Sequence, residues 1–316
     1  MRRLLAVLRH PVTRGVFVVI AVAAATVAIV HQREQIADAM RQLPLTVLLV
    51  AAALTPVHLW CTMLSWRAVM ADLGSPLSAR EAVGVFGPSQ LGKYVPGGVW
   101  NVVAAGELAA DLRIPRRRTF SAMLVAMLLS VVTGVTLGLP LLLTGAGVAQ
   151  PAWLLLAAPV LAVLVAPPVL NRLLGYTMRV LRRAPLDGAL STAGTVRATT
   201  WALLGWMIVG AQVWVLGLGL GMQAAVDTLA ASVAAYALAW VVGFVAVVAP
   251  AGLGAREVVL AALLGDRLDA GAVIVVVLAV RVLQTLGDLA FAALGVVWAR
   301  EARRRGQPQD VADGTG

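Results

Sequence analysis

The sequence has 316 residues, of which 60% are hydrophobic and 13% charged, with a formal net charge of +10 and a mean hydropathy of +0.90. About a quarter of the residues in a soluble globular domain are charged, so this composition excludes a water-soluble protein and indicates a polytopic membrane protein. The single cysteine excludes an intrachain disulfide framework and the three histidines are scattered, so we expect no metal site and no cofactor.

Apolar runs recur along the chain, and a helix needs about 20 residues to span the roughly 30 Å hydrocarbon core of a bilayer. Spans are predicted at 15–31, 45–66, 119–143, 152–170, 199–220, 228–248 and 270–298. Two shorter, broken segments lie near 83–105 and 250–265. We therefore predict an all-α polytopic transmembrane helix bundle, with one transmembrane domain at 15–298, a cytoplasmic N-terminal segment at 1–14 and a disordered cytoplasmic tail at 299–316.

The basic residues are distributed unevenly between the predicted loops. If the N-terminus is cytoplasmic, the loops on that side hold 19 of the 25 Lys and Arg residues, whereas those on the other side hold Arg33, Arg41 and Arg267. This asymmetry follows the positive-inside rule, so we expect a multi-pass protein of the cell (inner or plasma) membrane with both termini in the cytoplasm. The net charge is then a topology signal, and no nucleic-acid partner is expected.

The segment 83–105 is predicted to be a re-entrant hairpin, because the loops before and after it both belong to the basic side. The residues expected to interrupt a helix there are Pro88, Gly92, Pro96, Gly97 and Gly98. Broken backbone at membrane depth is tolerated only when it is buried in protein or faces a wet cavity. We therefore expect this hairpin to line a cavity.

The segment 228–265 breaks at Pro250, Gly252 and Gly254 and is predicted to begin and end on the opposite side. Charge counting leaves two arrangements open, a re-entrant hairpin or two complete crossings. PGGVWNVVAAGELAAD from Pro96 is similar to PAGLGAREVVLAALLGD from Pro250, which indicates an inverted repeat. Because proline suits the first turn of a helix, each break is expected to begin a half-helix. The free N–H groups at the start of such a helix bind phosphate, and the neighbouring glycines would let the phosphate approach the backbone closely.

Charged residues also fall inside the apolar segments: Lys93, Arg256, Glu257, Arg281 and Asp288. Each costs about 2.5–3.5 kcal/mol at a helix centre, so they must pair or face water. In the last span Arg281, Gln284, Thr285 and Asp288 share one helical face, and Asn101 and Glu107 are expected to reach the same cavity. Three cations exceed two acids, which suits an anionic ligand. The alternative is that the ion pairs only hold the helices together.

The segments QLGKYVPGGVWN at 90–101 and APAGLGAREVVLAALL at 249–264, with Arg281, Thr285 and Asp288, resemble the lysylphosphatidylglycerol synthase transmembrane-region family. These flippase-like proteins include the membrane half of the multiple peptide resistance factor. The resemblance covers roughly 15–298 and implies a helical bundle with re-entrant helices that moves a lipid between leaflets. It assigns the family motif to Lys93, Tyr94, Pro96, Gly97, Gly98, Trp100, Pro250, Gly252, Gly254, Arg256 and Glu257. The chain ends 18 residues after Trp298, so no aminoacyl-transferase domain and no lysine transfer are expected.

The sequence thus predicts a non-enzymatic flippase for an anionic, phosphate-bearing lipid, either a phospholipid or a polyprenyl-linked lipid. The headgroup would be held by the expected cavity residues, which are Lys93, Tyr94, Asn101, Glu107, Arg256, Glu257, Arg281, Gln284, Thr285 and Asp288. Two alternatives stay open: an ion-coupled secondary transporter of a small anion, with Glu257 or Asp288 as the coupling carboxylate, and a non-catalytic partner of an envelope-lipid biosynthesis enzyme. No nucleophile–base arrangement in the sequence supports catalysis.

Overall fold

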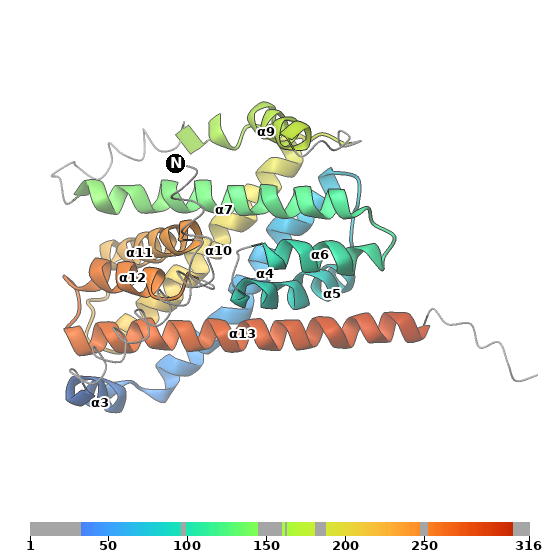
Figure 1. Cartoon of the computed structure of the whole chain (residues 1–316). Helices are drawn as coiled ribbons and strands as arrows, with labels where there is room; N and C mark the ends of the chain where they lie inside the picture. Colours follow the sequence, from blue (N-terminus) through green and yellow to red (C-terminus); the bar gives the residue numbers. More distant parts are fainter. Residues whose placement is uncertain are drawn as a thin grey trace, which may run out of the picture.

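The computed structural model describes residues 33–95, 99–144, 160–161, 163–180, 188–246 and 252–305 (Figure 1). Within these ranges the chain is helical, with no strand, and the predicted all-α polytopic bundle is confirmed. Several predicted features lie outside the described residues: the span at 15–31, most of the span at 152–170, and the break residues Pro96, Gly97, Gly98 and Pro250.

The described residues include long apolar helices at five of the predicted spans. These are α4 (Leu45–Asp72), α7 (Arg116–Thr144), α10 (Thr192–Leu218), α11 (Val226–Val245) and α13 (Ala270–Arg305). Three of them extend beyond the predicted boundaries at one end by six or seven residues, because backbone hydrogen bonding continues past the apolar run. In particular, α13 continues to Arg305, so the start of the predicted tail at 299–316 is helical.

Shorter helices complete the bundle: α3 (Arg33–Gln42), α5 (Ala79–Ser89), the 3-10 helix η1 (Gln90–Tyr94), α6 (Trp100–Ala110), α9 (Pro167–Val180) and α12 (Ala255–Leu264). The sequence did not predict α3, and it assigned the residues of α9 after 170 to a loop. Both helices are amphipathic, so polar and apolar residues are interspersed along their sequences. A sliding-window average of hydropathy therefore does not identify them. At ten residues α12 is about 15 Å long, half the hydrocarbon thickness, which favours a hairpin over two complete crossings.

Hydrogen bonds between side chains and backbone hold α4 against α10. Ser65 donates to the Ala198 carbonyl oxygen at 2.8 Å, and Gln212 donates to the Ala51 carbonyl oxygen at 2.9 Å. The hydrophobic effect does not drive helices together within a lipid bilayer. Interhelical hydrogen bonds and close packing of small residues stabilise the helix pair instead.

The first broken segment lies directly on α13 through two glycines. A Cβ added at Gly87 of α5 would lie 2.6 Å from the Phe291 carbonyl oxygen, and one added at Gly295 would lie 2.5 Å from the Val83 carbonyl oxygen. Any side chain larger than hydrogen would therefore push α5 away from α13. This contact fixes the position of η1 relative to the polar face of α13.

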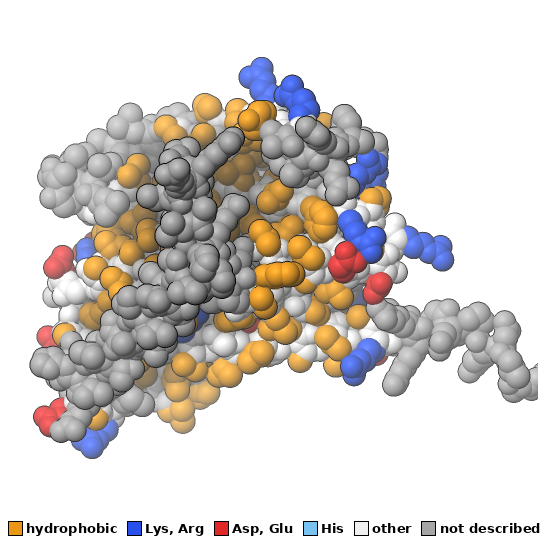
Figure 2. Space-filling view, viewed as in Figure 1, with side chains coloured by type: hydrophobic (Ala, Val, Ile, Leu, Met, Phe, Trp, Pro, Cys, Tyr) orange, Lys and Arg blue, Asp and Glu red, His pale blue; other side chains and the backbone are white. Residues whose placement is uncertain are grey.

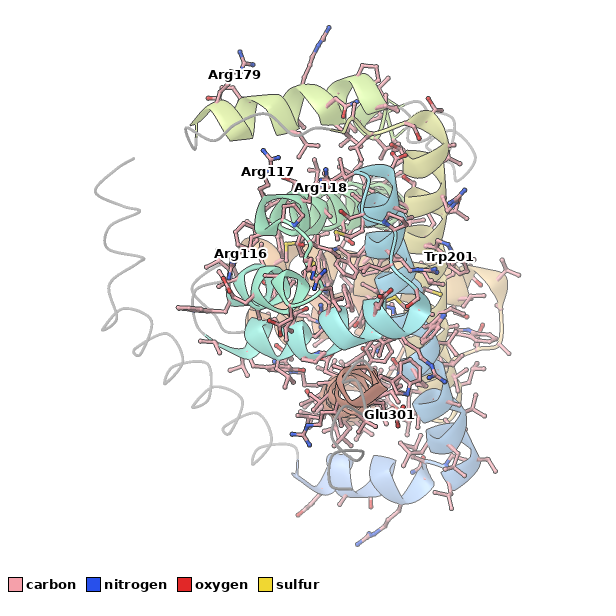
Figure 3. All side chains as sticks on the ribbon, turned by 90° about the vertical axis from the view of Figure 1, so that its right-hand side faces the viewer. Arg116, Arg117, Arg118, Arg179, Trp201 and Glu301 are labelled. Atoms are coloured by element: carbon pink, nitrogen blue, oxygen red, sulfur yellow. The ribbon has the colours of Figure 1, made fainter. Side chains whose placement is uncertain are left out.

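One end of the bundle collects the basic loops. Hydrophobic side chains cover much of the flank in Figure 2, whereas Lys and Arg gather at the end where Arg116, Arg117, Arg118 and Arg179 project in Figure 3. Arg118 donates to the Gly74 carbonyl oxygen at 3.1 Å, which joins the loop after α4 to the start of α7. The described loops at 65–82 and 106–118, which the charge pattern assigned to one side of the membrane, therefore lie together at one end of the bundle.

Candidate functional site: a polar cavity between the two broken segments

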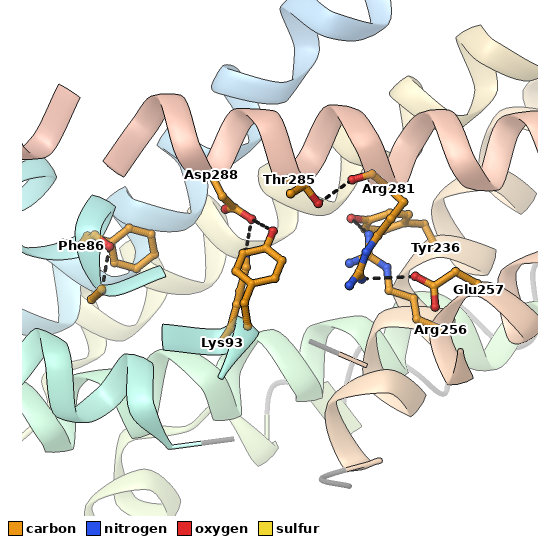
Figure 4. Close-up of polar contacts among 10 residues, drawn as sticks. Phe86, Lys93, Tyr236, Arg256, Glu257, Arg281, Thr285 and Asp288 are labelled. Atoms are coloured by element: carbon orange, nitrogen blue, oxygen red, sulfur yellow. Dashed lines mark hydrogen bonds and ion pairs between the residues drawn. The ribbon is translucent and has the colours of Figure 1, made fainter. Parts of the chain in front are cut away.

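A cavity of about 450 Å³ lies where the two broken segments meet α13 (Figure 4). In Figure 1, α5 and α6 of the first segment lie beside one half of α13, and α11 and α12 lie beside its other half. Its polar lining consists of His58, Thr62, Ser65, Gln90, Lys93, Tyr94, Asn101, Ser130, Tyr236, Arg256, Arg281, Gln284, Thr285 and Asp288. Its volume falls within the range of small-molecule sites.

The first break presents its polar residues through a tight turn. Pro88 lies in the last turn of α5, which ends at Ser89, and the 3-10 helix η1 that follows carries Lys93 and Tyr94. A Cβ added at Gly92 would lie 2.4 Å from the Asn101 backbone nitrogen, so the turn packs directly on the start of α6. This close contact brings Lys93, Tyr94 and the buried Asn101 to the same cavity.

Lys93, Tyr94 and Asp288 form the first polar cluster. Asp288 is 1% exposed, and its Oδ2 accepts from the Lys93 ammonium at 2.6 Å and from the Tyr94 hydroxyl at 2.6 Å. Its Oδ1 is buried and has no hydrogen-bond partner among the described residues. Charge-assisted bonds of this length are strong, so the cluster ties η1 to α13.

Tyr236, Arg256, Glu257 and Arg281 form the second polar cluster (Figure 4). Arg281 pairs with Glu257 at 3.2 Å, and the second Glu257 oxygen accepts from the Gly254 backbone N–H at 2.7 Å. Arg256 donates to the Tyr236 hydroxyl, and its guanidinium carbon lies 4.5 Å from the centroid of the Tyr236 ring. This cluster therefore ties α12 to both α11 and α13.

The charges of the cavity do not cancel. Of the three cations, Lys93 and Arg281 each have a carboxylate partner, and Arg256 forms no ion pair with any carboxylate in the described part of the chain. The Lys93–Asp288 and Arg281–Glu257 ion pairs also connect the two broken segments to α13. These two pairs can therefore have the helix-holding role that the sequence analysis gave as the alternative to ligand binding. The excess positive charge predicted from the sequence is located at Arg256.

Among the described residues, α6 begins at Trp100 and α12 at Ala255. Pro96 and Pro250, which were expected in the first turns of the half-helices, lie outside the described residues. The N–H group of Gly254, where φ is +86°, is occupied by the Glu257 carboxylate and is not free for a ligand. A carboxylate three residues into a helix is well placed to cap its positive end, and Glu257 does so here.

Gly252 lines the cavity with φ of +69°, and its lack of a side chain serves helix packing. A Cβ added at Gly252 would lie 2.8 Å from the Gly243 Cα. The sequence predicted that Gly252 lets a ligand approach the backbone closely. In the structure, Gly243 of α11 makes this close approach.

Glu107 and Glu257 are not among the residues that line the cavity. Glu257 pairs with Arg281, which does line the cavity. Glu107 accepts two hydrogen bonds from Arg116, at 2.8 and 2.6 Å, at the exposed basic end of the bundle. Hydrogen bonds from Arg116 hold the pKa of Glu107 below its usual range. Six residues of helix separate Glu107 from Asn101 by about 9 Å, which carries it away from the break.

Several cavity residues have no counterpart in the prediction. Tyr236 and His58 line the cavity, and His58 Nδ1 lies 3.0 Å from the Gly205 carbonyl oxygen. Gln284 donates to Gln212 at 2.8 Å, which extends the polar network to α10. Tyr236 and Gln212 are polar residues in the middle of apolar spans. Their position in the sequence could therefore have predicted that they face the interior of the bundle.

A family model described as "Lysylphosphatidylglycerol synthase TM region" matches residues 16–292, a range that includes both broken segments and the polar face of α13. No curated protein matches the chain.

Proposed function

Because the chain belongs to the lysylphosphatidylglycerol synthase TM region family, we propose that it moves an anionic, phosphate-bearing lipid between the leaflets of the cell membrane. In this proposal it catalyses no reaction, its basic end lies in the cytoplasm, and an enzyme that makes the lipid is a possible partner. The family name connects the chain with membrane lipids, and the cavity supplies the chemistry for an anionic headgroup.

The observation that carries the proposal is Arg256, an arginine that faces a cavity inside an apolar bundle and bonds to a tyrosine hydroxyl. A guanidinium presents several N–H donors in a planar fork that matches two oxygens of a phosphate. A phosphate headgroup would supply the negative charge that no carboxylate supplies to Arg256 in the described part of the chain.

The other cavity residues fit the same role. Lys93 is 34% exposed at its side chain, so an incoming phosphate can compete with Asp288 for its ammonium. Gln284 and Ser130 add neutral polar side chains to the cavity lining. A polar chamber of this kind lowers the cost of carrying a charged headgroup through hydrocarbon, while the tails of the lipid stay in the bilayer.

A scrambling assay in proteoliposomes tests this function. The protein is reconstituted with a fluorescent phosphatidylglycerol, and the loss of outer-leaflet fluorescence is followed after addition of a membrane-impermeant quencher. Because a hydrogen bond to a charged group contributes about 1.5–3 kcal/mol, Arg256→Gln should slow scrambling roughly tenfold or more. Arg267→Gln is the matched control, because Arg267 lies outside the cavity lining and donates to the Leu263 carbonyl oxygen.

Two results would count against a flippase. One is that the parent protein accelerates the exchange of no anionic lipid. The other is that Arg256→Gln scrambles as fast as the parent and the Arg267→Gln control.

A second candidate function is ion-coupled transport of a small anion, and the buried Asp288 favours it. Its carboxylate is 1% exposed, and its Oδ1 has no hydrogen-bond partner among the described residues, so a proton or a sodium ion has an oxygen to bind. This function predicts uptake of a soluble anion such as phosphate into vesicles that requires an ion gradient and is lost in Asp288→Asn. Lipid scrambling without a gradient, and without such uptake, would exclude it.

A further inference from the structure

Three aromatic side chains follow one face of α11 along the wall of the cavity. Tyr236, Trp240 and Phe244 recur every fourth residue and all line the cavity. The Trp240 and Phe244 rings are stacked, with centroids 5.2 Å apart and an interplanar angle of 7°. Trp206 of α10 packs edge-on against Trp240, at 5.4 Å between centroids, and supports the row from behind.

Exposure rises along this aromatic row. Tyr236, which holds Arg256, is 1% exposed, whereas Phe244 is 40% exposed and the neighbouring Val245 is 68% exposed. The eight residues from Tyr236 to Phe244 cover about 12 Å of helix. The row therefore leads from the cation that has no carboxylate partner in the described chain to the apolar outer surface of the bundle.

The first broken segment contributes an apolar side chain to the same cavity. Val99, just before α6, lines the cavity and is 56% exposed. Val99, Phe244 and Val245 therefore belong both to the cavity lining and to the exposed apolar surface of the described bundle. The entrance to a site for a soluble anion is expected to be polar, whereas these three residues make an apolar side to the cavity.

We propose that Trp240, Phe244, Val245 and Val99 form a lateral slot that holds a hydrocarbon chain of the transported lipid, while its phosphate is held at Arg256. This inference rests on the proposed function and deepens it, because it assigns the path of the tail. A hydrocarbon chain gains little free energy on moving from bilayer to protein, so the headgroup supplies the affinity and the slot supplies alignment and access.

Site-specific photo-crosslinking tests the slot. A benzophenone amino acid is placed at Val99 or Val245 in the full chain, and the protein is reconstituted in vesicles of phosphatidylglycerol and phosphatidylcholine. Matched control positions are Val103 and Val242, which are 39% and 41% exposed and do not line the cavity. Crosslinks at the slot positions should favour phosphatidylglycerol roughly tenfold over the controls, and Arg256→Gln should abolish that preference.

Bulky substitutions give a second measurement. Val99→Trp and Val245→Trp should slow lipid scrambling severalfold, whereas Val103→Trp and Val242→Trp should leave it unchanged. Equal crosslinking preference at slot and control positions, or a preference that survives Arg256→Gln, would overturn the slot. If those results accompany Arg256-dependent scrambling in the parent, the slot fails and the flippase stands. If the parent scrambles no lipid, the proposed function itself fails.

Discussion

The ion pair between Lys93 and Asp288 allows a quantitative test of how the first broken segment is held. The Lys93 ammonium lies 2.6 Å from Asp288 Oδ2, with side-chain exposures of 34% and 1%. A hydrogen bond to a charged group contributes about 1.5–3 kcal/mol, and partial exposure of Lys93 to water reduces this. We therefore expect a coupling free energy of about 1–2 kcal/mol between the two side chains.

A double-mutant cycle with Lys93→Met, Asp288→Asn and the double variant measures this coupling. Asn keeps the shape of the side chain and an oxygen that can accept from the Tyr94 hydroxyl, which lies 2.6 Å from Asp288 Oδ2. The free energy of unfolding is measured in mixed micelles by titration with a denaturing detergent. Asp288→Asn should destabilise the parent more than it destabilises Lys93→Met, because it leaves the ammonium without its partner.

The refuting result is additivity. If the two single substitutions add to within about 0.5 kcal/mol, the side chains do not interact in the membrane protein and the assigned geometry of η1 is wrong.

Three further predictions concern the packing and the limits of the cavity. Gly87→Ala should destabilise the protein by about 1–3 kcal/mol in the same unfolding titration, because its Cβ would lie 2.6 Å from a carbonyl oxygen of α13, whereas Gly175→Ala, with nothing within 4 Å, should not. Glu107→Gln should leave scrambling at the parental rate, because Glu107 lies outside the cavity lining, and a tenfold loss would contradict its exclusion. Gly252→Ala should lower both the free energy of unfolding and the scrambling rate more than Gly221→Ala does. Both glycines have positive φ, but only the Cβ added at Gly252 would lie against α11. Equal effects would attribute the loss to backbone conformation alone.

Much of the secondary structure could be read from local apolar runs. The helices α4, α7, α10, α11 and α13 were predicted because a membrane span is a local property of about 20 successive residues. The amphipathic helices α3 and α9 were not predicted because polar residues separate their apolar residues along the sequence, so neither helix contains a continuous apolar run. The inverted repeat and the membrane orientation of the two broken segments stay predictions.

For the site, the sequence could predict the residue types. Charges within apolar segments are costly, which identified Lys93, Arg256, Arg281 and Asp288, and all four line the cavity. Helical spacing also placed Gln284 and Thr285 on the same face of α13, and both line it too.

The sequence by itself determined that this is an all-α membrane protein with interrupted helices and with more cations than acids within its apolar segments. It could do so because composition, helical period and the cost of charge in lipid act locally along the chain. The tertiary structure alone decided which charges pair, that Glu257 caps its own helix, that Glu107 lies at the basic end and that Tyr236 holds Arg256. Pairing depends on distances of a few ångströms between residues far apart in the chain, and only the packing of helices against α13 sets those distances.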